Sequence, residues 1–146
     1  MNNARSADGK LKVVLDTNVY ISFLTTPHSS LAVIFEYATR KTYHLLTSPY
    51  IIGELARTLR GKPFFFNEAS VQNSIRPVVK TAVFVRPLVV PTVILHDPDD
   101  DHILACAKAG NADLIVTGDR DLLRLKEYSG IPIVRPKDFV RTLGGL

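Results

Sequence analysis

Two short polar clusters directly follow apolar runs, and each contains a carboxylate. The run that ends at Leu15 is followed by Asp16-Thr17-Asn18, and the run Leu114–Thr117 is followed by Gly118-Asp119. Isolated Asp and Asn residues are ordinary turn formers, whereas carboxylates held rigidly can bind a cation or move a proton. If both runs are strands of one parallel sheet, their exits lie at the same edge, where such sheets place functional groups.

A third source of carboxylates is the run Asp97-Pro98-Asp99-Asp100-Asp101, which opens a segment of helical period. A helix start favours Asp as the N-cap, Pro at the first position and acids in the first turn. These preferences explain Asp97, Asp99 and Asp100, and they explain Asp101 least well. We therefore expect Asp101 to face the sheet edge as the functional acid, with Asp100 as the alternative left open by the consecutive aspartates.

Glu54 is the fourth candidate acid, and it lies within a helical segment opened by Ser48-Pro49. It stands on the shoulder of an apolar stripe formed by Ile51, Ile52, Leu55 and Leu59. The competing interpretation is a surface glutamate in an ordinary helix ion pair with Arg57. His102, beside Asp101, is more consistent with a solvent-facing helical residue than with a metal ligand.

The elements that must position these side chains alternate along the chain. Strands are expected at Leu11–Leu15, Tyr43–Thr47, Ala82–Arg86, Leu114–Thr117 and Ile131–Val134. Helices are expected at Val19–Arg40 (in two pieces split at Thr25-Thr26-Pro27-His28), after Ser48-Pro49, and at Asn67–Lys80, Asp97–Ala109 and Asp121–Tyr128. Pro77 should weaken the last turn of the third of these. Continuous apolar strands between helices indicate a parallel sheet covered on both faces. We predict a three-layer α/β/α, Rossmann-like fold with a central parallel five-stranded sheet.

Length and composition narrow the class of protein. The 146 residues favour a single domain over residues 11–146, after a disordered lead-in at residues 1–10 without the apolar core of a signal peptide. The single cysteine, Cys106, is expected in the core, cannot form an internal disulfide, and fits a reducing, cytoplasmic setting. The apolar region Val83–Leu95 is interrupted by Arg86 and two prolines, so no membrane span is expected. The net charge of +4 permits a polyanionic partner.

In their order and spacing, four segments resemble the PIN-domain family of metal-dependent ribonucleases. They are VVLDTN (13–18), SPYIIGEL (48–55), DPDDDHILACA (97–107) and LIVTGDRDLL (114–123). The likeness runs from Leu11 to about Arg141. Within the family, the chain resembles above all the PIN toxins of bacterial and archaeal toxin–antitoxin pairs. The segment Lys62–Asn67 matches nothing assignable in the family.

The resemblance implies an acidic pocket at the carboxyl edge of the sheet. The family's catalytic, metal-binding acids fall on Asp16, Glu54, Asp101 and Asp119. Its supporting polar positions fall on Thr17, Asn18, Thr117 and Asp121, the last of which we expect mainly to cap the following helix. The resemblance further implies an endoribonuclease with RNA as substrate, a small antitoxin protein as partner, and a homodimer.

The chemistry of converging carboxylates supports a metal site. Such groups repel one another and raise one another's pKa values, and a divalent cation removes that cost. All-oxygen ligands without Cys or paired His favour Mg²⁺ or Mn²⁺ over zinc. The reaction expected of such a site is metal-assisted phosphodiester hydrolysis. Nearby cations are equally compatible with RNA contacts and with a solvated surface; they are Arg57, Arg60, Lys62, Arg120, Arg124 and Lys126.

Other functions compete with this interpretation. A phosphatase of the haloacid-dehalogenase type also begins with a strand that ends in Asp, but it needs a second Asp where this chain has Asn18. A nucleotide-binding module would need a glycine-rich loop, and the sequence contains neither common form. A 5′-nuclease for structured DNA usually carries large insertions that this short chain lacks. The most serious alternative is a non-catalytic PIN scaffold that binds protein or RNA, although such domains typically lose acids that this chain keeps.

Overall fold

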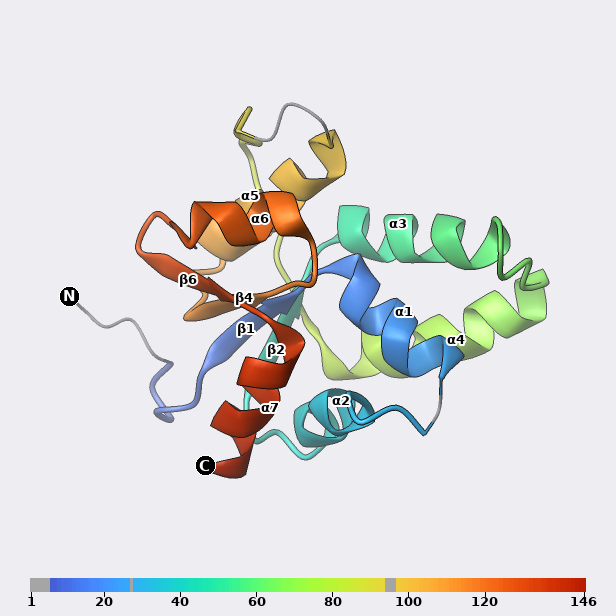
Figure 1. The fold of residues 1–146 in the computed structure, drawn as a ribbon, viewed down its shortest axis with the longest axis horizontal. Helices are drawn as coiled ribbons and strands as arrows, with labels where there is room; N and C mark the ends of the chain where they lie inside the picture. The colour runs from blue at the N-terminus through green and yellow to red at the C-terminus, as the bar shows by residue number, and fades with distance from the viewer. Residues whose placement is uncertain (1–5, 27, 94–96) are drawn as a thin grey trace.

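The structure is a computed structural model that describes residues 6–26, 28–93 and 97–146. Its strands are β1 (Lys12–Leu15), β2 (His44–Thr47), β3 (Val83–Phe84), β4 (Leu114–Val116), β5 (Glu127–Tyr128) and β6 (Ile131–Val134). Within the described residues they form one six-stranded sheet in the order β3-β2-β1-β4-β6-β5 (Figure 1). The neighbours from β3 to β6 are parallel, and β5 pairs antiparallel with β6. The mostly parallel sheet confirms the predicted fold class.

The prediction of five strands omitted β5, and it placed a helix over Asp121–Tyr128. The helix α6 spans only Arg120–Leu125, because Lys126 takes a left-handed backbone conformation with a φ of 62°. A left-handed residue ends a helix, and here the chain then turns back to pair with β6. The edge strand β3 is also shorter than the predicted Ala82–Arg86, since it pairs on one side only within the described residues.

The remaining helices are α1 (Thr17–Thr25), α2 (Ala32–Thr39), α3 (Pro49–Arg60), α4 (Glu68–Thr81), α5 (Pro98–Ala109) and α7 (Pro136–Gly144). Side chains cap three of them as their sequences predict, namely Ser48, Asn67 and Asp97. Pro77 does not shorten α4, which continues to Thr81. The helix α7 was not predicted; its buried Phe139 contacts the ring of Tyr43 edge-on at 5.1 Å.

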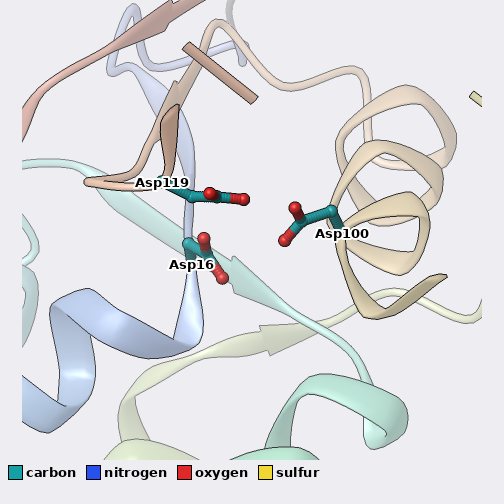
Figure 2. Close-up of side chains that lie close together, drawn as sticks. All are labelled: Asp16, Asp100 and Asp119. Atoms are coloured by element: carbon teal, nitrogen blue, oxygen red, sulfur yellow. The ribbon is translucent and has the colours of Figure 1, made fainter. Parts of the chain in front are cut away.

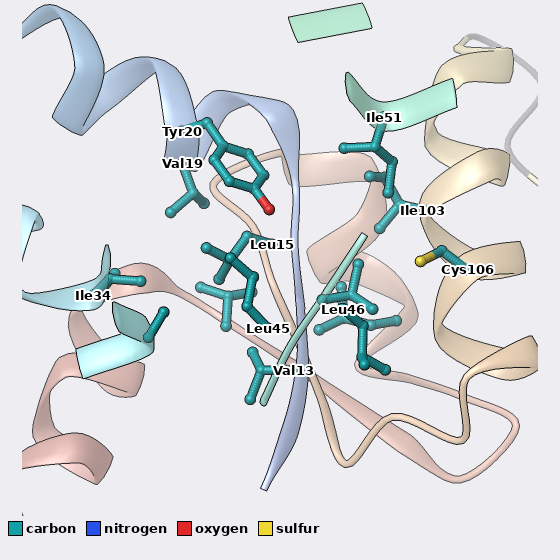
Figure 3. Close-up of a cluster of buried hydrophobic side chains, with 14 of the residues drawn as sticks. Val13, Leu15, Val19, Tyr20, Ile34, Leu45, Leu46, Ile51, Ile103 and Cys106 are labelled. Carbon is teal, nitrogen blue, oxygen red and sulfur yellow. The ribbon is translucent and has the colours of Figure 1, made fainter. Parts of the chain in front are cut away.

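The core lies on both faces of the central strands, which confirms the three layers. Figure 3 shows Val19, Tyr20 and Ile34, from α1 and α2, on one side of β1, and Ile103 and Cys106, from α5, on the other. Successive strand residues point to opposite faces, so β1 and β2 contribute side chains to both halves of the core. The buried Cys106 is a core residue, as expected.

Two regions of the sequence lie partly outside the described residues. Of the lead-in expected at residues 1–10, residues 6–10 are described, and Asp8 Oδ2 lies 2.7 Å from His44 Nε2. Of the apolar region Val83–Leu95, the described part runs to Val93 and exposes Leu88. In the described part of the chain, no helix has the length and apolar character needed to cross a membrane.

Two leucines test the packing of α5 against the sheet. Leu104 is 0% exposed, whereas Leu88 is 99% exposed. Leu104→Ala should lower the free energy of unfolding by about 2–5 kcal/mol, because it leaves a cavity. Leu88→Ala should change it by less than about 0.5 kcal/mol. Urea unfolding of both variants measures the difference, and equal losses would contradict the packing.

Candidate metal centre

Three aspartates converge at the carboxyl edge of the sheet (Figure 2). One carboxylate oxygen from each of Asp16, Asp100 and Asp119 lies within 4.8 Å of the others. Asp16 follows β1 and Asp119 follows Thr117 and Gly118 at the end of β4, while Asp100 lies in the first turn of α5. Because β1 and β4 are neighbouring strands, their pairing brings Asp16 and Asp119 together.

Hydrogen bonds fix the orientation of the Asp16 carboxylate, which is 6% exposed. Its Oδ2 accepts from Thr117 Oγ1 at 2.6 Å and from Asn18 Nδ2 at 2.9 Å. Its Oδ1 accepts from the backbone N–H of Thr17 at 2.6 Å, so Asp16 is also the N-cap of α1. The side chain therefore cannot rotate away from the cluster without losing these bonds.

The same polar residues tie the two strand exits to each other. Thr117 Oγ1 accepts from the backbone N–H of Asp119 at 2.9 Å, in addition to donating to Asp16. Asn18 Oδ1 accepts from the backbone N–H of Gly118 at 3.2 Å. Thr117 and Asn18 thus link the loop after β4 to the start of α1. Thr17 contributes its backbone N–H and lines the adjacent cavity.

The structure brings Asp100, rather than the expected Asp101, into the cluster. Asp101 is buried elsewhere, with Oδ1 accepting from the backbone N–H of Val93 at 3.0 Å. Helix geometry explains the difference, because Ile103, Leu104 and Ala107 follow Asp100 by three, four and seven residues and are buried. Asp100 continues this buried face of α5 toward the sheet edge, a signal that was present in the sequence.

Glu54 lies on the wall of an acidic cavity of about 420 Å³. The acids that line this cavity are Asp16, Glu54, Asp97, Asp99, Asp100 and Asp119. Glu54 also forms the expected ion pair with Arg57. The ion pair is therefore confirmed, and the catalytic role of Glu54 stays a prediction that its place on the cavity wall permits. Neither Arg57 nor any other described cation lines the cavity.

Asp121 does not take the capping role predicted for it. Asp119 caps α6, with its Oδ1 accepting from the backbone N–H of Asp121 at 3.3 Å. Asp121 instead pairs with Arg124 at 2.9 Å, one turn later in α6. The N-cap was misplaced because Asp-Arg-Asp offers two possible caps two residues apart. Asp119 consequently serves both the helix start and the acidic cluster.

Other residues singled out in the sequence are not members of the three-acid cluster. His102 is half-buried rather than solvent-facing, because its ring stacks on that of Tyr50. The segment Lys62–Asn67 joins α3 to α4, at the end of α3 opposite to its capped start (Figure 1). Arg60 pairs with Glu68 at 2.9 Å. Like Arg57 and Arg124, it therefore forms an ion pair with an acid on the helix surface.

Burial makes the cluster costly to ionise. It raises the pKa of Asp16, and the hydrogen bonds from Thr117 and Thr17 partly oppose that shift. Burial also raises the pKa of Asp100 to about 9, helped by hydrogen bonding with Asp119 and by the charge of Asp16. Oδ2 of Asp100 is buried without a hydrogen-bond partner among the described residues. A hard divalent cation with oxygen ligands, such as Mg²⁺ or Mn²⁺, fits this donor set and would relieve the repulsion.

Comparison with known proteins agrees with this architecture. A sequence profile of the family described as the PIN domain matches residues 12–121. The uncharacterized protein MJ1680 of Methanocaldococcus jannaschii is 28% identical over 142 residues, covering 90% of each chain. PAE2754 of Pyrobaculum aerophilum is similar in fold, with a TM-score of 0.62 and 14% identity over 94% of this chain and 92% of that one. VapBC2 of Rickettsia felis, whose structure was solved bound to a DNA fragment from their promoter, is also similar in fold. Its TM-score is 0.60 and its sequence identity is 14%, over 86% of this chain and 98% of that one. The profile match confirms the resemblance found in the sequence.

Two neighbouring aspartates provide a matched test of the third ligand. Asp100→Asn should weaken Mn²⁺ binding at least about tenfold, since even residues that only orient a ligand contribute about 10–100-fold. Asp101→Asn should leave the affinity unchanged, because Asp101 is held by Val93 outside the cluster. Isothermal titration calorimetry measures both affinities. The opposite ranking would make Asp101 the ligand, and no binding by the wild type would contradict the metal centre.

The raised pKa of Asp100 makes the stability of the folded protein depend on pH. Between its ordinary value of 3.8 and about 9, the folded protein keeps a proton that the unfolded chain has lost. Stability should therefore fall as the pH rises through this range when a chelator is present. Thermal unfolding at several pH values should show this slope in the wild type, a weaker slope in Asp100→Asn, and a weaker slope with Mn²⁺. A melting temperature that rises over the same range would refute it.

Proposed function

The chain belongs to the PIN domain family, and we propose that it is a metal-dependent endoribonuclease that hydrolyses phosphodiester bonds in RNA. PIN domains are generally metal-dependent nucleases. The observation that carries the proposal is the convergence of Asp16, Asp100 and Asp119 within 4.8 Å, beside a cavity whose charged lining is acidic. A catalytic site of this kind needs several carboxylates in one place, and a folding role does not.

The residues of the cluster have distinct tasks in this proposal. A bound Mg²⁺ or Mn²⁺ supplies a lowered pKa for the attacking water and positive charge opposite the reacting phosphate. Asp16 is the central ligand, because Thr117 and Asn18 hold its carboxylate in one orientation. Asp100 and Asp119 complete the set, and Asp100 takes the place first expected for Asp101. Glu54, on the cavity wall, orients the attacking water or contributes to a second ion.

Cation binding and RNA binding are coupled at this site. The six acids of the cavity repel a phosphate when no cation offsets their charge. Asp100 keeps a proton at neutral pH that it would have to lose to bind a cation, so the cation affinity should rise with pH. The chain as a whole is nevertheless basic, with a net charge of +4, which favours approach of a polyanion. A cation held by the cluster would offset part of this negative charge and would give the RNA phosphate a positive partner in the cavity.

The partners follow from the resemblance to PIN toxins. We propose the role of toxin in a toxin–antitoxin pair, a small antitoxin protein that covers the acidic cavity, a homodimer, and action in the cytoplasm. The similarity in fold to VapBC2 is in keeping with this role, and that protein was solved on a DNA fragment from their promoter. Co-expression with a protein encoded beside this chain, followed by size-exclusion chromatography, tests both the partner and the dimer.

A single substitution tests the catalytic assignment. Asp16→Asn keeps the shape of the side chain but removes its charge. Cleavage of a defined RNA with Mg²⁺ or Mn²⁺ should fall by more than about 100-fold, beyond the roughly 10–100-fold typical of residues that only orient a ligand. The melting temperature of the protein without a cation should fall only slightly. The amide nitrogen cannot accept the bonds that one carboxylate oxygen accepts, but the substitution also removes a charge whose burial is unfavourable.

A matched control uses another Asp→Asn change. Asp138 pairs with Arg141 on the surface of α7, so Asp138→Asn should cleave RNA like the wild type. Full activity in Asp16→Asn, or cleavage that persists in a chelator, would refute the proposal. Absence of both RNA cleavage and Mn²⁺ stabilisation in the wild type would favour the non-catalytic scaffold.

A further inference from the structure

Two aromatic rings stack beside the acidic cavity. Tyr50, at the start of α3, and His102, on α5, have ring centroids 3.4 Å apart and planes inclined by 7°. The Tyr50 hydroxyl donates to Asp99, which lines the acidic cavity. That bond, with burial, raises the pKa of Tyr50 to about 12, so its hydroxyl stays a donor. The ring pair is therefore fixed to the wall of the proposed catalytic site.

The rings also line a cavity of their own, of about 240 Å³. We call this the ring pocket, and its walls include Pro49, Tyr50, Arg86, Pro87, Val90 and His102. It is smaller than the ~300–1,000 Å³ of pockets for drug-sized ligands. Flat aromatic and proline surfaces with one guanidinium suit a single planar group beside a negative charge.

We propose that the ring pocket binds one unpaired base of the RNA strand whose phosphate lies at the acidic cluster. This inference rests on the proposed ribonuclease function. Single-stranded RNA is read by stacking its bases on aromatic side chains, including His, and on Arg planes. Asp99 belongs to the acidic cavity and contacts Tyr50 of the ring pocket, so one strand can occupy both. The exposed Arg86 supplies positive charge to a neighbouring phosphate.

The ring pocket has a consequence for the substrate class. A base must leave its stack in a duplex before it can enter a pocket, which costs a few kcal/mol. Single-stranded RNA should therefore be the substrate, and duplex RNA of the same sequence should not. Stacking alone does not distinguish the four bases, because each has a π face. The pocket thus contributes affinity and position rather than a strict sequence preference.

Fluorescence of a stacked base tests the proposal by binding alone. The protein is the Glu54→Gln variant, which keeps the three aspartates that would hold Mn²⁺ and should cleave the strand slowly. The probe is a single-stranded RNA that contains 2-aminopurine, with Mn²⁺ present. Binding should quench the probe, because stacking quenches 2-aminopurine. Adding Tyr50→Leu should abolish the quenching and weaken binding about 5- to 150-fold, the equivalent of ~1–3 kcal/mol per stacked base.

Two further variants separate stacking from folding. Tyr50→Phe keeps the ring but loses the bond to Asp99, so it should retain the quenching. Tyr37→Leu makes the same change as Tyr50→Leu at a half-buried tyrosine on α2, outside both cavities, and should bind like its parent. Mn²⁺ affinity and melting temperature check that each variant is folded. Equal binding by Tyr50→Leu and Tyr37→Leu would overturn the ring pocket.

Cleavage by the wild type provides the second arm. Each substrate carries one abasic nucleotide, and the series moves it through the positions around the mapped cleavage position. Cleavage should be slow at one position only, where the missing base would have entered the ring pocket. The Tyr50→Leu enzyme should cleave the substrate lacking that base as fast as the substrate that keeps it. A flat abasic scan with normal cleavage would refute the ring pocket and leave the nuclease standing. No cleavage by the wild type, with quenching that depends on Tyr50, would refute the nuclease and leave base binding standing.

Discussion

Mutual repulsion among closely spaced carboxylates, two of them buried, is the constraint on which the arrangement of this site depends. Asp16, Asp100 and half-buried Asp119 place oxygens within 4.8 Å of one another. Burial deprives Asp16 and Asp100 of the water that would screen their charges. The pKa of Asp100 rises to about 9 in response. Such a cluster persists only if other interactions hold each acid in place and a proton or a cation offsets the charge.

The topology of the sheet supplies much of that support. In the order β3-β2-β1-β4-β6, the chain moves outward from β1 to β2 and β3, then returns to the other side of β1 with β4. The strand order thus reverses between β1 and β4, the position at which open α/β sheets form a crevice for ligands. Asp16 and Asp119 lie at the two exits that flank this crevice. Thr117 bonds to both, so the crevice walls cannot separate without breaking the bonds that orient the acids.

The sequence was informative where local patterns and general rules coincide. Apolar runs followed by polar clusters place Asp16 and Asp119 at the same edge of the sheet, since parallel strands share a carboxyl edge. The pairing of β1 with β4, which makes the two acids neighbours, comes from the structure. The choice between Asp100 and Asp101 was harder, because they differ by only about 100° around the helix and every residue from Ile103 to Ala107 is buried. The stacking of Tyr50 on His102 joins two helices that are distant in the sequence, and no local sequence pattern predicts it. Contacts of that kind depend on how helices pack, which the sequence alone does not specify.

In the proposed reaction, a divalent cation held by these acids contacts the phosphate that is hydrolysed. The most direct measurement is cleavage of an RNA in which sulfur replaces a non-bridging oxygen of the scissile phosphate. Hard Mg²⁺ binds sulfur poorly, whereas softer cations accept it. We expect slow cleavage of the sulfur-containing RNA with Mg²⁺ and recovery with Mn²⁺ or Cd²⁺. Equal cleavage of both RNAs with Mg²⁺, for each sulfur isomer, would contradict the claim.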